Sequence, residues 1–379
     1  MVLKGMAWAA LALLAWIPAA IAQQETNAYT RHELLDPASA KFHIFYETSV
    51  IRPKAQYYFN PVRKTSVATD VRVTDMATGA NLEFQIIDDK QAAADGFAEA
   101  NPEMNYIRVK LARPVPEQGG EVRIRLEKTY EDHVSYRTDG DTLIFERAVG
   151  APRNAFVLPP GYSLVSSTMP AQIAQESDGR IRLSFFNPIP GENPLKIVAR
   201  KSGDMVRLVK ELPVVQRAHD SQDIVYFLGA PETHGFDVYR DHTEDQAGVS
   251  QYTNAVRRGN TAARQYARNL DTGEVLHPHI VKGEALFQFA PVKPGQSVRL
   301  RLYESYVDAG SYRLEDGQLV FEQRLGEPTD AIVLPTGWVL TDSASPALVS
   351  KTQDGRTRLD FINSRNDELA IRVRARRAG

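Results

Sequence analysis

The sequence of 379 residues contains no cysteine. This absence excludes disulfide scaffolds, thiolate zinc sites, iron–sulfur clusters and cysteine nucleophiles. Charge of either sign is not in excess, since 45 Lys and Arg residues face 47 Asp and Glu residues. Nucleic-acid-binding domains usually carry a clear basic excess, so the composition argues against a nucleic-acid partner. Gly-rich phosphate-binding loops are also lacking, so we expect no nucleotide and no cofactor.

Long apolar runs occur only at the N-terminus, where residues 1–22 read MVLKGMAWAALALLAWIPAAIA. Lys4 supplies a positive charge, an apolar run follows, and Ala20-Ile21-Ala22 fits the small-x-small pattern of a cleavage site. A membrane anchor is the alternative, but a span needs about 20 apolar residues and Pro18 interrupts this run. We therefore predict a cleaved signal peptide, a periplasmic or secreted protein, and no transmembrane anchor after cleavage.

The chain contains an internal duplication. EVRIRLEKTYEDHVSYR, which begins at Glu121, is matched by SVRLRLYESYVDAGSYR, which begins at Ser297. An ungapped comparison of residues 121–200 with 297–376 gives 33 identities in 80 positions, against about five expected by chance. The front halves align at another spacing, which leaves the first copy with an insertion at about 88–105. We predict that this insertion is a surface loop or one short helix.

The duplication divides the chain into a signal peptide (1–22), a first domain (23–205), a linker (206–222) and a second domain (223–379). Segments such as VRIRL and VRLRL alternate apolar and charged residues, which is typical of strands with one buried and one wet face. Asp-Gly pairs between such segments favour tight hairpin turns. We predict an all-β protein of two tandem homologous antiparallel β-sandwich-like domains, with the arginines of these segments facing water.

The segments LLDPASAKFHIFYE, YYFNPVRKTS and VLPPGYSLVSSTMPAQ carry a resemblance. The chain resembles uncharacterised exported bacterial proteins made of tandem β-sandwich-like repeats. This resemblance covers most of the mature chain and implies the architecture, but it brings no established activity.

Histidines form one candidate metal site. His277-Pro278-His279 would place two imidazoles on one face of a strand, and His242 is a candidate third ligand. Pro278 also restricts this strand to a sheet edge or a bulge. Isolated histidine pairs are more often surface residues, and we prefer that interpretation.

Aromatic and basic residues of the front halves form a candidate binding surface. Tyr57, Tyr58 and Arg63 lie in the first copy, and Tyr252 and Arg257 lie in the second. Neighbouring residues of a strand point to opposite faces, so at least one of the adjacent tyrosines should be exposed. Such a tyrosine beside an arginine could stack on a glycan, or it could cover a domain interface.

Both copies also share polar residues, namely Asp132, Ser135, Tyr136 and Arg137 in the first and Asp308, Ser311, Tyr312 and Arg313 in the second. They could bind a sugar or a carboxylate. A structural role fits better, because Arg137 and Glu146 would face each other across a hairpin and catalytic groups seldom occur twice in one chain.

No serine-hydrolase motif or metalloprotease motif is present in the sequence. We therefore expect an exported, non-catalytic protein that binds or scaffolds a cell-envelope component, either a protein or a glycan. The alternative is a secreted hydrolase or lyase that acts on polysaccharide or peptidoglycan, with its site between the domains.

Overall fold

The structure is a computed structural model that describes residues 25–187, 191–202, 223–255, 265–327, 329–363 and 368–378. These residues form strands almost throughout, which confirms the predicted all-β class. The predicted signal peptide, the linker 206–222 and Arg257 lie outside the described residues. None of the helices within the described ranges is both long and apolar enough to cross a membrane.

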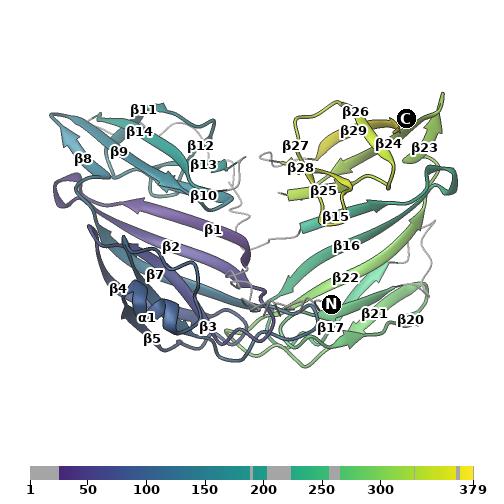
Figure 1. The fold of residues 1–379 in the computed structure, drawn as a ribbon, viewed down its shortest axis with the longest axis horizontal. Coiled ribbons are helices and arrows are strands. Elements are labelled where there is room, and N and C mark those ends of the chain that lie inside the picture. The colour runs from purple at the N-terminus through teal and green to yellow at the C-terminus, as the bar shows by residue number, and fades with distance from the viewer. Residues whose placement is uncertain are drawn as a thin grey trace, which may run out of the picture.

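The first copy of the duplication, called repeat 1 below, is built around a seven-stranded sheet (Figure 1). Its strands lie in the order β12 (Gln172–Gln175), β13 (Ile181–Phe186), β10 (Arg153–Val157), β1 (Glu25–Leu34), β2 (Lys41–Val50), β7 (Val122–Glu131) and β4 (Val67–Asp75). A four-stranded sheet has the order β11 (Tyr162–Ser167), β14 (Asn193–Lys201), β9 (Thr142–Val149) and β8 (Tyr136–Asp139). A three-stranded sheet has the order β3 (Tyr57–Arg63), β6 (Met104–Lys110) and β5 (Phe84–Ile87). The helices are the 3-10 turn η1 (Pro37–Ser39) and α1 (Asp89–Ala94).

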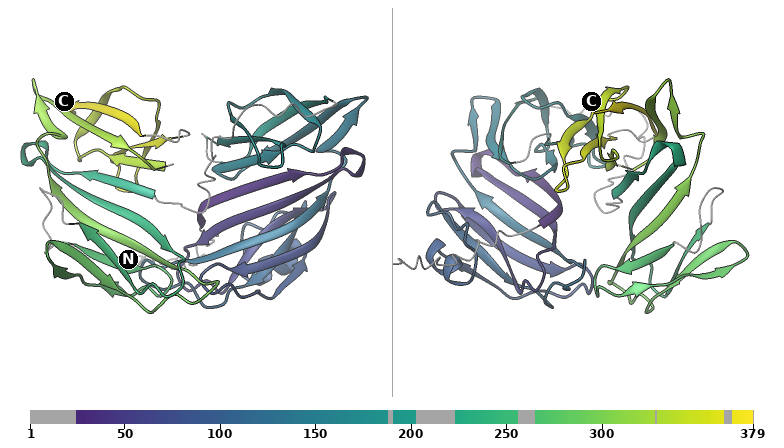
Figure 2. Two further views of the ribbon diagram at one scale, coloured as in Figure 1. Left: turned by 180° about the vertical axis from the view of Figure 1, so that it is seen from behind. Right: turned by 45° about the vertical axis from the view of Figure 1, so that its right-hand side comes forward.

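The second copy, repeat 2, repeats this strand order (Figure 2). Its large sheet contains β19 (Val275–Leu276), β18 (Tyr266–Asn269), β22 (Val298–Val307), β16 (Gly235–Glu244), β15 (Asp223–Leu228), β25 (Thr329–Val333), β28 (Thr357–Ile362) and β27 (Leu348–Lys351). The smaller sheets are β23 (Tyr312–Glu315), β24 (Gln318–Leu325), β29 (Leu369–Arg377) and β26 (Trp338–Ser343), and β17 (Gln251–Ala255), β21 (Glu284–Gln288) and β20 (His279–Val281). Its 3-10 turn is η2 (Pro231–Thr233).

The large sheets are not wholly antiparallel as expected. β1 runs parallel to β10, and β15 runs parallel to β25 at the equivalent place. Hairpin turns make sequence neighbours antiparallel, but these partners come from opposite halves of a repeat and no short turn joins them. Each parallel pair therefore unites the front and back halves of its repeat in one sheet.

Alternation along the strands produces the core. On β7, Val122, Ile124 and Leu126 are buried and belong to the large apolar cluster of repeat 1. This cluster also takes in residues of the three-stranded and four-stranded sheets, such as Val109 and Phe145. The two smaller sheets therefore both pack on one face of the large sheet.

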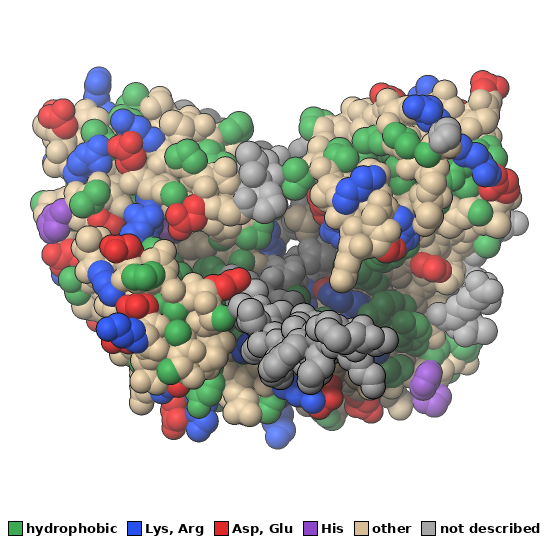
Figure 3. All heavy atoms as spheres, viewed as in Figure 1, with side chains coloured by type: hydrophobic (Ala, Val, Ile, Leu, Met, Phe, Trp, Pro, Cys, Tyr) green, Lys and Arg blue, Asp and Glu red, His purple; other side chains and the backbone are tan. Residues whose placement is uncertain are grey.

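The two repeats meet through a contact that is made twice, once in each direction. Ser297 N, beside the start of β22, donates to Ala77 O at 3.0 Å, and Glu121 N, beside the start of β7, donates to Leu270 O at 2.8 Å. The turns that accept these bonds are equivalent in the duplication. The pattern is that of an isologous interface inside one chain. An opening separates the repeats above this junction (Figure 3).

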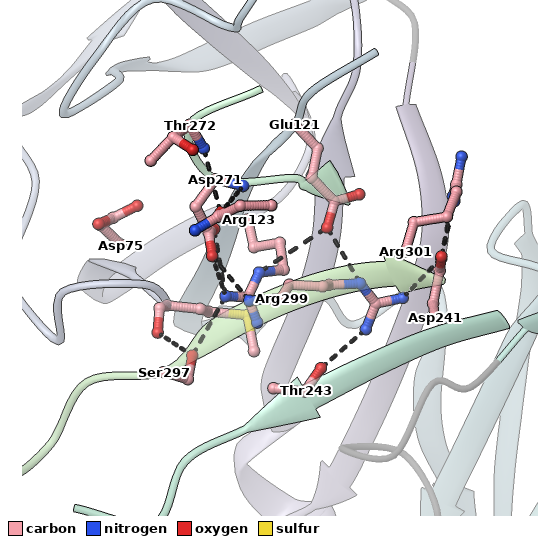
Figure 4. Close-up of polar contacts among 12 residues, drawn as sticks. Asp75, Glu121, Arg123, Asp241, Thr243, Asp271, Thr272, Ser297, Arg299 and Arg301 are labelled. Atoms are coloured by element: carbon pink, nitrogen blue, oxygen red, sulfur yellow. Dashed lines mark hydrogen bonds and ion pairs between the residues drawn. The ribbon is translucent and has the colours of Figure 1, made fainter. Parts of the chain in front are cut away.

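A buried charge network fills the junction (Figure 4). Arg299 lies 3.1 Å from Glu121 Oε1 and 3.2 Å from Asp241 Oδ2, and Arg123 Nη2 donates to Asp271 Oδ1 at 3.2 Å. Arg123 and Arg299 are 4% and 2% exposed, so the expectation that the arginines of VRIRL and VRLRL face water is wrong for these two. Period-two alternation describes a sheet face, and here a second repeat covers the face that would otherwise be wet.

Candidate functional site

A pocket of about 750 Å³ opens in repeat 1 between the two smaller sheets. The large sheet forms its floor through residues of β1, β2 and β7, and β3, β6 and the β9–β10 connection form its walls. Pockets of this size are typical of sites for small ligands. Its polar lining includes Thr30, His32, Asn60, Lys128, Arg147 and Asn154.

Two cations are buried at this pocket. Lys128 is 4% exposed, and its ammonium lies 4.8 Å from the centre of the Tyr130 ring. The guanidinium of Arg147 lies 5.0 Å from the same ring centre. Lys128 donates a hydrogen bond to Asn60 Oδ1, and within the described residues it has no ion pair. Burial, together with the positive charge of Arg147, lowers the pKa of Lys128 to about 7.

Arg147 is only partly neutralised. Its Nη1 lies 3.3 Å from Asp132 Oδ2, but that carboxylate also accepts hydrogen bonds from Ser135. Burial and the positive charge of Arg63 lower the pKa of Arg147, against the attraction of Tyr130 and Asp132. A guanidinium stays charged in proteins. The pocket therefore keeps a positive potential at every pH at which the fold is stable.

Two further buried side chains have polar atoms without a partner among the described residues. His32 is stacked on Phe156 with a ring separation of 4.4 Å, and its Nδ1 has no hydrogen-bond partner. Burial and the charges of Arg147 and Lys128 hold the pKa of His32 well below its usual range, so it is neutral. Asn154 donates through Nδ2 to Ala151 O at 2.6 Å, but its Oδ1 is unpartnered. Such groups are costly unless something binds them.

The insertion of the first copy forms one wall of this pocket. Phe97, Glu99, Asn101 and Met104 all belong to it and line the pocket. Phe97 stacks on Phe59 at 5.2 Å, and α1, capped by Asp88, begins the insertion as the predicted short helix. The insertion is therefore more than a surface loop, because it encloses a site that repeat 2 does not build in this way.

The same position in repeat 2 has the opposite charge. Lys128 corresponds to Glu304, Arg147 to Gln323 and Asn154 to Asp330, whereas Asn60 and Tyr130 correspond to an asparagine and a tyrosine again: Asn254 and Tyr306. Asn254 Nδ2 and the Tyr306 hydroxyl both donate to the Glu304 carboxylate. Arg240 donates to Asn254 Oδ1 at 3.3 Å. The polar groups of repeat 2 thus satisfy one another, whereas those of repeat 1 do not.

The predicted aromatic surface is divided by the structure. Tyr58 is buried and lines the pocket, whereas Tyr57 is half-buried beneath the guanidinium of Arg108, 5.2 Å from its ring centre. Arg63 is half-buried and lies outside the pocket lining. In repeat 2, the hydroxyl of Tyr252 accepts a hydrogen bond from Arg240 at 2.8 Å. The structure therefore brings only Tyr58 of this set to the pocket.

The predicted histidine site is not assembled in the described part of the chain, which contains no group of three or more potential metal-ligating residues. Pro278 interrupts the strand, so His277 follows β19 while His279 begins β20, in another sheet. His242 packs on Tyr252 with a ring separation of 4.6 Å. The expectation that one strand face carries both imidazoles is wrong, because proline cannot continue the ladder.

The polar residues shared by the two copies have structural roles. Asp132 accepts hydrogen bonds from Ser135 N and Oγ, and Asp308 does the same for Ser311. The hydroxyl of Tyr136 donates to Leu35 O at 2.7 Å, and Arg137 pairs with Glu146 at 2.8 Å across the β8–β9 hairpin. These contacts close turns and do not point to a ligand.

We expect Tyr136→Phe to lower the free energy of unfolding by about 1 kcal/mol, because Leu35 O loses its hydroxyl donor. Tyr312→Phe, which removes the equivalent bond to Gly229 O, is the matched test in repeat 2. Urea unfolding would measure both. Equal stability of either variant and the natural protein would contradict this structural role.

A second hollow, of about 350 Å³, lies between the repeats. Its lining includes Arg301 and Arg358, which pair with Asp241 and Asp360 at 2.6 Å each. These carboxylates are held by arginines, so they do not form the pair of free acids that a glycosidase between the domains would need.

Comparisons with known proteins assign no family: no family model and no curated protein matches the chain. Among solved structures, an aminopeptidase N family protein from Idiomarina loihiensis is 8% identical, with a TM-score of 0.30, and the match covers 54% of this chain and 32% of that one. A putative protease from Parabacteroides distasonis is 10% identical, with a TM-score of 0.26, and the match covers 93% and 92% of the two chains. Collagen adhesin from S. aureus is 8% identical, with a TM-score of 0.16, covering 76% and 81%.

Proposed function

We propose that this is an exported, non-catalytic binding protein of the cell envelope, and that its ligand occupies the pocket of repeat 1. One observation carries the proposal: a buried lysine without an ion pair lies in a pocket together with an arginine. Burying a charge without a partner costs stability. Such a cost at an open pocket is typical of a site whose partner arrives with a ligand.

The contrast between the copies supports this proposal. A purely structural position would be expected to carry the same kind of side chain in both repeats, as Asp132 and Asp308 do. The pocket residues instead differ in charge, and only repeat 1 has the insertion that forms a wall. Repeat 2 then supports repeat 1 through the buried junction.

Binding is tested by pull-down from a cell-envelope extract, with the mature protein as bait. We expect Lys128→Met to lose the captured component, because the variant removes the unpaired cation of the pocket. Lys110→Met, which changes an exposed lysine paired only with Glu83 at 3.7 Å, is the matched control and should capture as much as the natural protein. Equal capture by both variants would contradict the assignment of the pocket.

A lyase acting on acidic polysaccharide is the second candidate function. The observation that favours it is the pKa of Lys128, lowered to about 7, which suits a general base. Lys128 would take the proton from the carbon beside a carboxylate, and the bond to the leaving sugar oxygen would break to form a carbon–carbon double bond. Appearance of the ultraviolet absorbance of an unsaturated sugar during incubation with acidic polysaccharide would establish this candidate and refute the non-catalytic proposal.

A further inference from the structure

The charge of the pocket defines what its ligand must supply. Lys128 and Arg147 lie within 5.0 Å of one tyrosine ring centre, and Asp132 is the only carboxylate that pairs with either of them in the described residues. An anionic group that reached Lys128 would complete its charge balance in a site of low dielectric constant, where such an interaction is strong. Glu99 and Glu192, which also line the pocket, do not pair with these cations.

The rest of the lining fits a ring that carries hydroxyl groups. Aromatic side chains surround the pocket, namely Tyr46, Tyr58, Phe97, Tyr106 and Tyr130. Their faces can pack on the C–H face of a sugar ring. Side chains that both donate and accept hydrogen bonds stand among them, namely Thr30, Asn60, Asn101 and Asn154. The unpartnered Oδ1 of Asn154 is an acceptor for a sugar hydroxyl.

An extended peptide fits this pocket less well. β1, β2 and β7, which form the floor, each have a strand on both sides, so their backbone groups are already paired. β3 is an edge strand, but it contains Pro61 at the pocket, which has no N–H to donate. The pocket therefore offers side chains rather than a free backbone edge, whereas peptides usually add a strand to an edge.

We propose that the ligand of repeat 1 is an acidic saccharide, held with its anionic group at Lys128 and its ring against the aromatic wall. This inference rests on the proposed binding function and names its ligand class. It applies to uronic acids and to phosphorylated or sulfated sugars alike, since each supplies an anion on a hydroxyl-bearing ring.

The geometry has a consequence for protons. The groups that face Lys128 are Arg147 from β9, His32 from β1, Tyr46 from β2, Tyr58 from β3 and Tyr130 from β7. Arg147 remains charged, and His32 is kept neutral by burial. Lys128 has a pKa of about 7 in the free protein, so at pH 8 it is mostly neutral. An arriving anion favours the charged form, so binding should take up a proton from solution.

The test is isothermal titration calorimetry at pH 8 with a uronic acid oligosaccharide, an uncharged oligosaccharide of equal length, a sulfated oligosaccharide and inorganic phosphate. Titrations in two buffers that differ in ionisation enthalpy measure proton uptake. We expect at least one acidic oligosaccharide to bind with uptake of close to one proton, and the uncharged one to bind at least about tenfold more weakly, which is about 1.4 kcal/mol.

Two variants separate charge from fold. Lys128→Met should lose binding by at least about tenfold. Lys128→Arg should retain it without proton uptake, because arginine is charged before the ligand arrives. A circular dichroism spectrum and an unfolding curve show whether each variant is folded, and the comparison of ligands on the natural protein holds even if neither is.

The outcomes also distinguish this inference from the proposed function. Equal binding of charged and uncharged oligosaccharides, or binding of inorganic phosphate as tightly as of any acidic saccharide, would overturn the ligand class and leave the pocket as a binding site. Failure of every acidic saccharide to bind, while Lys128→Met still abolishes capture from envelope extract, would also overturn the ligand class alone. Loss of neither binding nor capture in that variant would overturn both proposals.

Discussion

Replacing Lys128 with methionine is expected to make the free protein more stable, by about 1–3 kcal/mol at pH 7. The lysine is buried, has no ion pair in the described part of the chain, and is repelled by Arg147. Methionine fills a similar volume without a charge, although it leaves Asn60 Oδ1 without its donor. Guanidinium unfolding, followed by circular dichroism, measures the change. A less stable Lys128→Met variant would show that the charge is compensated in the free protein.

The pH dependence of the same comparison has a definite sign. The unfolded chain holds the lysine proton up to the ordinary pKa of 10.5, whereas the folded protein releases it near pH 7. Between these values the unfolded state binds more protons, so the natural protein gains stability relative to Lys128→Met as pH rises, by up to about 1.4 kcal/mol per pH unit. The cost of the charge is fully present below pH 7 and is gone above the unfolded pKa. A pH-independent difference would contradict the lowered pKa of Lys128.

Truncation of Arg299 to alanine is expected to have the largest destabilising effect, about 3–5 kcal/mol. Arg299 contacts Glu121 of the other repeat, and Asp241 and Thr243 of its own, from a position that is 2% exposed. Its removal leaves Glu121 buried beside Arg123 at only 3.8 Å, and burial already raises the pKa of Glu121. Unfolding by guanidinium measures the loss, and small-angle scattering shows whether the repeats separate.

Arg301→Ala is the matched control for this variant. Arg301 lies on the same strand and pairs with the same Asp241 at 2.6 Å, but its side chain is 24% exposed and it does not contact Glu121. We expect a smaller loss of stability and no change in the arrangement of the repeats. If both variants lost the same stability, the effect would come from Asp241 rather than from the junction.

The sequence allows much of the fold to be predicted and little of the site. The duplication, the strand alternation and the Asp-Gly turns all indicate β-structure, because they depend on contacts between residues close in the chain. The parallel pairing of β1 with β10 and the burial of Arg123 depend on segments far apart in sequence. No local pattern reports such contacts, and the interpretation of the arginines as solvent-facing failed for this reason.

The candidate site was missed because attention rested on the residues that the copies share. Shared residues such as Asp132 and Tyr136 close turns in both repeats. The signal for the pocket lay in the differences, namely a lysine facing Glu304 in the alignment and an insertion in one copy only. A charge reversal at the position of Lys128, where alternation predicts a buried side chain, is the feature that could have pointed to it. His32 and Asn154 gave no comparable signal, since single polar residues of strands are common.

The most direct test of this account is the pKa of Lys128 in the free and ligand-bound protein, measured by nuclear magnetic resonance of the lysine side-chain carbons. The account predicts one lysine that titrates near pH 7 in the free protein, is absent from Lys128→Met, and shifts to a higher pKa when an acidic saccharide is added. If every lysine titrated near the ordinary value of about 10.4, with or without ligand, the unpaired buried cation on which the proposed function rests would not exist.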